Sequence, residues 1–161
     1  MTGSAPQRRR GLPFGLAGML FVDAGIVLLF AAFDAVNWYS LPRFGTLDFH
    51  QLHTLTAHGV GARAPRWYFS WLGWVLLASA ALFGLVATIR SPLAIAFRIG
   101  GVLVSLIAIG ATYWSLHKLV TPASVFDNTC AGMWLTFAGF VLTGVGAALG
   151  PLGSRSATIS E

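Results

Sequence analysis

PFGLAGMLFVDAGIVLLFAAFDA, at residues 13–35, is long and apolar enough to cross a lipid bilayer. A hydrocarbon core about 30 Å thick needs about 20 apolar residues in a helix that rises about 1.5 Å per residue. Three similar stretches follow, at residues 67–89, 92–116 and 130–150. The sequence therefore predicts an all-α membrane protein in which an antiparallel bundle of four transmembrane helices forms a single domain over residues 1–161.

The composition agrees with this fold class. The chain is 56% hydrophobic and 9% charged, whereas soluble domains carry about 25% charged residues. Its net charge of +5 is scattered, apart from one basic run at residues 8–10 beside the first span. Such a run orients the span and attracts anionic lipid headgroups, so we expect membrane lipids as partners and no nucleic acid. With Cys130 as its one cysteine, the chain cannot form an intrachain disulfide or a thiolate zinc site.

Basic residues also predict the orientation, because cytoplasmic loops carry an excess of them. The cytoplasmic side is expected to hold Arg8, Arg9, Arg10, Arg90, Arg98 and Arg155. The outer side is expected to hold Arg43, Arg63, Arg66 and Lys118. Both termini are then cytoplasmic, residues 36–66 form an outer loop and residues 151–161 a tail. Arg greatly outnumbers Lys, and Ala and Gly are abundant, as in bacteria with GC-rich genomes. We therefore expect a multi-pass protein of the bacterial cytoplasmic (inner) membrane.

The first outer loop carries the signature of a short amphipathic helix. Asp48 is a candidate N-cap, and Gln51 three residues later completes a capping box. Leu47 and Leu52 flank the cap as a hydrophobic staple does, and Gly59 offers a C-terminal stop. We expect this helix to lie on the membrane surface or over the outer end of the bundle.

Small residues recur about every seven positions within the spans. Membrane helices associate through close backbone approach at such residues, and this period is that of left-handed packing at a crossing angle of about +20°. The residues expected at the helix contacts are Gly18, Gly25, Gly73, Ala80, Ser105, Ala108, Gly132, Gly139 and Gly146. The same repeat includes Gly11, Ala32, Ala87, Gly101, Thr112 and Ser115. The sequence therefore predicts a compact left-handed bundle.

Asp23 lies near the expected bilayer midplane. An ionised carboxylate there costs at least about 2.5–3.5 kcal/mol. Eleven steps of about 100° per residue bring Asp34 back to the face of Asp23, and Phe30 shares that face, whereas Gly25 points about 160° away. If the glycines pack inside the bundle, Asp23, Phe30 and Asp34 form a stripe that faces outward.

Three interpretations of Asp23 are open. The first is a neutral structural residue that hydrogen-bonds locally, with Ser79 and Ser105 at plausible depth. The second is a contact with another subunit, which an outward-facing polar stripe favours. The third is a proton or ion relay, which usually needs several aligned polar groups.

All six tryptophans fall in or near the expected outer half: Trp38, Trp67, Trp71, Trp74, Trp114 and Trp134. This placement is typical of an interfacial aromatic belt, but a belt normally decorates both interfaces. Trp67, Trp71 and Trp74 share a helix face. A packed aromatic cap under the outer loop, or an aromatic docking surface, is therefore the alternative.

His50 and His53 share one face of the expected outer helix, a spacing that suits bidentate metal ligation. His58 is off that face, and no cysteine supports the site. Surface histidines are the favoured interpretation, with His50 and His53 kept as metal candidates, and no cofactor is expected. The sequence also has no Walker loop, no dinucleotide glycine fingerprint and no Gly-x-Ser-x-Gly elbow.

A docking surface without a catalytic constellation favours a non-enzymatic accessory subunit of a larger bacterial membrane complex for transport, respiration or envelope synthesis. Its partner is expected to be another integral membrane protein or a second copy of the chain. The alternatives are a small oligomeric transporter or channel with Asp23 as the coupling group, and an outer-face metal-binding protein using Asp48, His50 and His53. The span layout resembles the claudin-type tetraspan layout in topology alone, since the paired loop cysteines of that family are absent.

Overall fold

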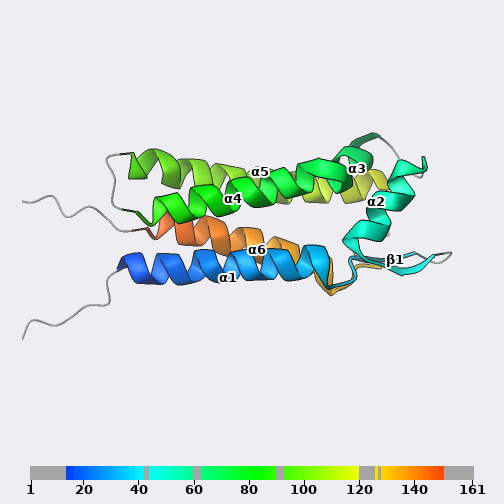
Figure 1. The fold of residues 1–161 in the computed structure, drawn as a ribbon, viewed down its shortest axis with the longest axis horizontal. Coiled ribbons are helices and arrows are strands. Elements are labelled where there is room, and N and C mark those ends of the chain that lie inside the picture. Colours follow the sequence, from blue (N-terminus) through cyan, green and yellow to red (C-terminus); the bar gives the residue numbers. More distant parts are fainter. Residues whose placement is uncertain are drawn as a thin grey trace, which may run out of the picture.

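Four helical rods run side by side in alternating directions (Figure 1). The computed structural model describes residues 14–41, 44–59, 63–89, 93–119, 126 and 128–150. Four of its helices are long and apolar enough to cross a membrane, which confirms the predicted class of a four-span, mostly helical membrane protein. Parts of the sequence-based predictions lie outside the described residues, namely Arg8–Arg10, Gly11, Arg43, Arg90, Arg155 and the tail at 151–161.

The observed spans agree with the predicted ones to within a few residues at each end. They are α1 (Phe14–Asp34), the continuous rod of α3 (Arg63–Trp67), η1 (Tyr68–Leu72) and α4 (Gly73–Ala87), then α5 (Ala94–Leu119) and α6 (Ala131–Ala148). The second rod begins at Arg63 and not at residue 67. Pro65 lies in its first turn, where a missing N–H costs no intrahelical hydrogen bond.

The second rod contains a π-helical turn, η1, that the sequence did not predict. Such a turn inserts an extra residue and shifts the faces of the helix that follows. Tyr68 and Phe69 are buried within it, while Trp67 just before it and Trp71 inside it are more than half exposed. The turn therefore divides the aromatic residues of this rod between the core and the outer surface.

Small residues form the contacts between the rods. A Cβ atom placed on Gly25 would lie 2.7 Å from the carbonyl oxygen of Gly139, and one on Gly146 would lie 2.7 Å from that of Gly18. The backbones of α1 and α6 therefore touch at these glycines. Every described member of the predicted repeat is buried: Gly18, Gly25, Ala32, Gly73, Ala80, Ala87, Gly101, Ser105, Ala108, Thr112, Ser115, Gly132, Gly139 and Gly146. The handedness of the bundle stays a prediction.

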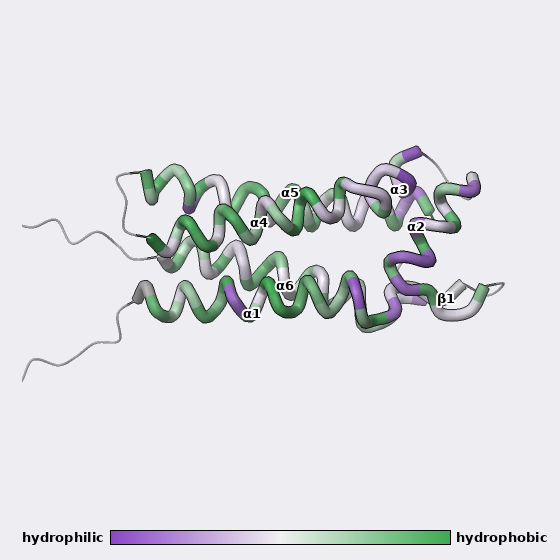
Figure 2. Tube along the Cα trace, viewed as in Figure 1, coloured by the Kyte–Doolittle hydropathy of each residue, from purple (hydrophilic) through white to green (hydrophobic). Residues whose placement is uncertain are grey.

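A β-hairpin and a short helix follow α1 at one end of the bundle, where hydrophilic residues gather (Figure 2). The strands β1 (Tyr39–Leu41) and β2 (Gly45–Leu47) pair antiparallel, with Gly45 at φ +73° in the turn. The segment before α6 joins this hairpin, because the N–H of Ser40 donates to the carbonyl of Asn128 and that of Cys130 to the carbonyl of Trp38. Both connections at this end are thus tied together.

The helix α2 (Phe49–Ala57) begins at the predicted capping box. The backbone N–H of Gln51 donates to Oδ1 of Asp48 at 2.7 Å, and the N–H of Asp48 donates to Oε1 of Gln51 at 3.0 Å. Gly59 follows the helix at φ +90°, the conformation expected of a glycine stop. Its position outside the membrane stays a prediction.

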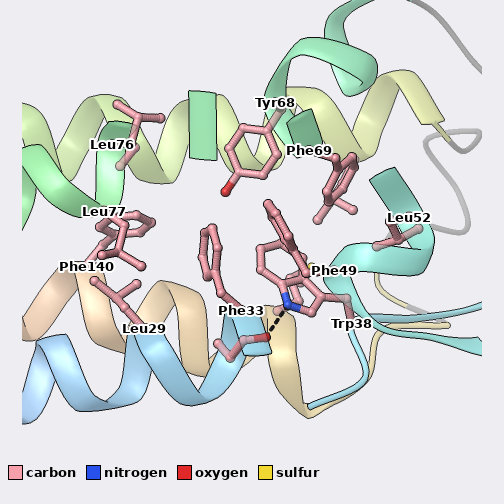
Figure 3. Packing of buried hydrophobic residues seen from close by; sticks show 14 of the residues in the cluster. Leu29, Phe33, Trp38, Phe49, Leu52, Tyr68, Phe69, Leu76, Leu77 and Phe140 are labelled. Atoms are coloured by element: carbon pink, nitrogen blue, oxygen red, sulfur yellow. Dashed lines mark hydrogen bonds between the residues drawn. The ribbon is translucent and has the colours of Figure 1, made fainter. Parts of the chain in front are cut away.

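An aromatic core joins the hairpin end to the spans (Figure 3). Phe33 stacks on Phe49 at 4.3 Å between ring centroids, and Trp38 meets Phe69 edge-on at 5.9 Å. The indole Nε1–H of Trp38 donates to the carbonyl of Ala32 at 2.6 Å. Because Trp38 is fully buried, it belongs to a packed core under the loop and not to an interfacial belt.

Candidate functional site

Asp23 faces the outside of the bundle. It is exposed, whereas Gly18 and Gly25 on the other side of α1 are buried against α6. Asp23 lies nine residues after the start of α1 and eleven before its end, so it sits close to the middle of a helix about 31 Å long. If α1 spans the bilayer, this carboxylate meets lipid at mid-depth.

The side chain of Asp23 has no hydrogen-bond or ion-pair partner among the described residues. Neither serine considered as its partner reaches it. Ser105 is buried between α5 and α6, where its Cβ lies 3.1 Å from the position that a Cβ on Gly144 would take. A local hydrogen bond that satisfies Asp23 is therefore not seen in the described part of the chain.

The stripe that begins at Asp23 continues to the hairpin end of α1. Phe30 is half exposed, and Asp34 is exposed at the last turn. A shallow groove of about 430 Å³ runs beside them, lined by Phe30, Ala31, Asp34, Ala35 and Trp74. The groove places Trp74 of the second rod beside Phe30 and Asp34 of α1.

The tryptophan face consists of Trp67, Trp71 and Trp74, whose side chains are 59%, 53% and 41% exposed. Trp74 also packs inward, with ring centroids 5.3 Å from Phe33 and 6.0 Å from Phe49. The residues predicted to contact a partner, namely Asp23, Phe30, Asp34, Trp67, Trp71 and Trp74, are all exposed, and they are together called the docking face below.

His50 and His53 line a separate pocket at the hairpin end. Their ring centroids are 6.2 Å apart, and Asp34 and Asp48 also line the pocket. Within the described ranges, no group of three or more His, Cys, Asp or Glu side chains is placed to hold a metal ion. His58 lines a different pocket, between α2 and the hairpin.

The centre of the bundle is mostly apolar. Its buried threonines bond to their own helices, since the hydroxyls of Thr112, Thr136 and Thr143 donate to the carbonyl four residues earlier. The hydroxyl of Tyr68 lies 2.6 Å from Thr112 Oγ1. No Asp, Glu, Lys or Arg among the described residues is fully buried. The described interior thus holds hydroxyl groups and no buried acidic or basic side chain of these four types.

The four long apolar helices are those of a multi-pass helical membrane protein by their length and composition. No protein-family model, curated protein or solved structure matches the chain. The functional assignment consequently depends on the surface chemistry described above.

Proposed function

We propose that the protein is a non-enzymatic accessory subunit of a larger complex in a bacterial inner membrane, which it joins through the docking face. One observation carries the proposal: Asp23 is exposed at the middle of α1 without a partner in its own described chain. A carboxylate in the hydrocarbon region costs at least about 2.5–3.5 kcal/mol. A neighbouring helix that supplies a cation or hydrogen-bond donor offsets this cost.

The expected occupant is a transmembrane helix of another integral membrane protein. It brings Lys, Arg or an amide or hydroxyl donor to the depth of Asp23, and an apolar side chain to the groove beside Phe30. A second copy of the chain fits less well. Arg98 lies four residues, or about 6 Å, from the start of α5. Asp23 lies nine residues, or about 14 Å, from the start of α1 at the same end of the bundle (Figure 1). The two side chains are therefore at different depths along the bundle.

The face also explains why the second rod is rich in exposed tryptophan. Trp67, Trp71 and Trp74 offer large, rigid contact areas that lose little conformational entropy on binding. They lie toward the end of the bundle that we assign to the outer side, with both termini cytoplasmic. The partner is therefore contacted along the outer half of the membrane and at the outer interface.

The test compares Asp23→Asn with wild type in a gentle-detergent purification, with co-purified chains quantified by mass spectrometry. The substitution removes the charge and keeps the shape. We expect the partner to fall by at least about tenfold, because an interfacial charge pair is worth about 1.5 kcal/mol or more. Asp48→Asn, which lies off the face and keeps a good N-cap residue, is the matched control. Equal recovery of the partner from Asp23→Asn would refute the proposal.

A further inference from the structure

A pocket of about 250 Å³ opens at the hairpin end of the bundle, where the end of α1, the start of α2 and the second rod meet. Its lining combines carboxylates, imidazoles and aromatic rings: Phe33, Asp34, Asp48, Phe49, His50, His53, Phe69, Ser70 and Trp74. None of these described lining residues is Lys or Arg. The lining set therefore carries only negative formal charge when the histidines are neutral.

The negative potential is concentrated at Asp34. This residue ends α1, where the helix carries about half a negative charge from its terminal carbonyl groups. Asp48 is partly compensated, because it caps the N-terminus of α2 and accepts a hydrogen bond from Gln51. Asp34 has no such compensation among the described residues. A bound cation would relieve the unfavourable placement of this acid at a helix C-terminus.

The aromatic walls select the kind of cation. Four rings line the pocket, but Phe33, Phe49 and Phe69 are at most 3% exposed, so Trp74, at 41%, is the ring whose face a ligand can reach. The faces of such rings attract organic cations, most strongly at tryptophan. A metal ion has too few ligands here, because no group of three metal-binding side chains converges in the described chain. The volume is also below the range of about 300–1,000 Å³ typical of drug-sized ligand sites, so the ligand is small.

One polar atom in the pocket lining is unpaired. Nδ1 of His53 is buried and has no hydrogen-bond partner among the described residues. A buried polar atom without a partner is destabilising. Nδ1 is closed off from the pocket in this structure, so the contacts to a ligand fall to the exposed groups of Asp34 and Trp74.

We propose that this pocket binds a small organic cation of the ammonium or quaternary ammonium class. Asp34 pairs with the charge, and Trp74 contacts the groups attached to the nitrogen. The ammonium group comes from a free solute or from the headgroup of a choline or ethanolamine lipid. The proposal does not rest on the docking face, although Asp34 and Trp74 line both.

Calorimetric titration of the purified full-length protein in detergent tests this site. The probes are choline, ethanolamine and tetramethylammonium, with 3,3-dimethylbutan-1-ol as the uncharged isostere of choline. We expect saturable binding of the cations and binding of the isostere that is weaker by about tenfold or more. Equal binding of choline and its isostere, or no saturable binding of any cation, would overturn the proposal.

Variants locate the site. Trp74→Leu and Asp34→Asn should each weaken choline binding by about fivefold or more. Trp71→Leu and Asp23→Asn, on the same two rods but outside the pocket, should leave it unchanged. Circular dichroism melting of each variant checks that it is folded. Full binding by folded Trp74→Leu, or an equal loss in Trp71→Leu, would overturn the assignment.

The two sources of the ligand separate in one comparison. A short-chain soluble phosphatidylcholine should bind more tightly than choline if the site takes a lipid headgroup, and more weakly if it takes a free solute. Both results support an ammonium site and differ only in its source. Asp48→Asn then distinguishes this proposal from the docking proposal, because it should weaken cation binding and leave partner recovery intact.

Discussion

Replacing Gly25 by Ala tests the packing of α1 on α6. The new Cβ would lie 2.7 Å from the carbonyl oxygen of Gly139 and 2.9 Å from the backbone nitrogen of Thr143. Both are backbone atoms, so neither can rotate away. Restoring a carbon–oxygen distance of about 3.3 Å requires a separation of about 0.6 Å, which is 3.3 minus 2.7.

A shift of this size at a close backbone contact of α1 and α6 should destabilise the bundle by about 1–3 kcal/mol, the usual cost of overpacking. Alanine also favours a helix over glycine by about 1 kcal/mol in water, which opposes the loss. Gly110→Ala provides the matched control. A Cβ at Gly110 would have no neighbour within 4 Å, so this variant gains helix propensity and creates no steric clash.

The assay is reversible unfolding in mixed micelles, in which SDS is titrated against a mild detergent and helix content is followed by circular dichroism. We expect the stability of Gly25→Ala to fall below that of Gly110→Ala by about 1–3 kcal/mol. The difference between two glycine-to-alanine changes removes most of the propensity effect. Equal stabilities for the two variants would refute the claim that α1 and α6 touch at Gly25.

Three further predictions follow from the fold. Thr112→Val should cost about 1–3 kcal/mol of stability in the same unfolding assay, because it leaves the hydroxyl of Tyr68 buried without a partner. The double variant Tyr68→Phe, Thr112→Val removes that hydroxyl as well and should lose less stability. An equal or smaller loss in Thr112→Val than in the double variant would contradict this. Asp48→Ala should destabilise α2 by about 1 kcal/mol, seen as faster amide hydrogen exchange in that helix, while Asp48→Asn should not; equal exchange in both would show that the cap contributes nothing. Reporter fusions at the two termini should both be active in the cytoplasm, and a reporter on the opposite side for either end would refute the proposed orientation.

The sequence predicted the membrane spans because their signal is local. About 20 consecutive apolar residues are sufficient to identify a crossing helix, and the observed helices end close to the predicted positions. The capping box at Asp48 and the stop at Gly59 are local signals too, and both appear in the structure. The repeat of small residues about every seven positions is visible in the sequence alone, and every described member of it is buried in the structure.

The hairpin and the π-helical turn were missed for physical reasons. Each strand has three residues, too few to show an alternating pattern. The glycine at position 45 is a sequence signal for a turn, and in the structure it has a positive φ. The extra residue of η1 follows from how Tyr68 and Phe69 fit the core, which a helical projection of the sequence does not contain.

The pocket could not be predicted as a whole because its parts come from distant segments. His50 and His53 were candidates from their helical spacing, and Asp34 from its stripe on α1. Only the fold places Trp74 and Asp34 beside them. Likewise, the burial of Trp38 depends on the hairpin that positions it against the spans.

Photo-crosslinking from Phe30 in intact membranes tests the central claim most directly. A photoreactive amino acid at Phe30 samples the docking face. The same group at Leu106 on α5, whose side chain is 60% exposed against 51% for Phe30, samples a surface away from it. We predict a crosslink to one other integral membrane protein from position 30, lost in Asp23→Asn, and no such product from position 106. Crosslinks to lipid alone from both positions, or to a second copy of the chain from position 30, would contradict the account.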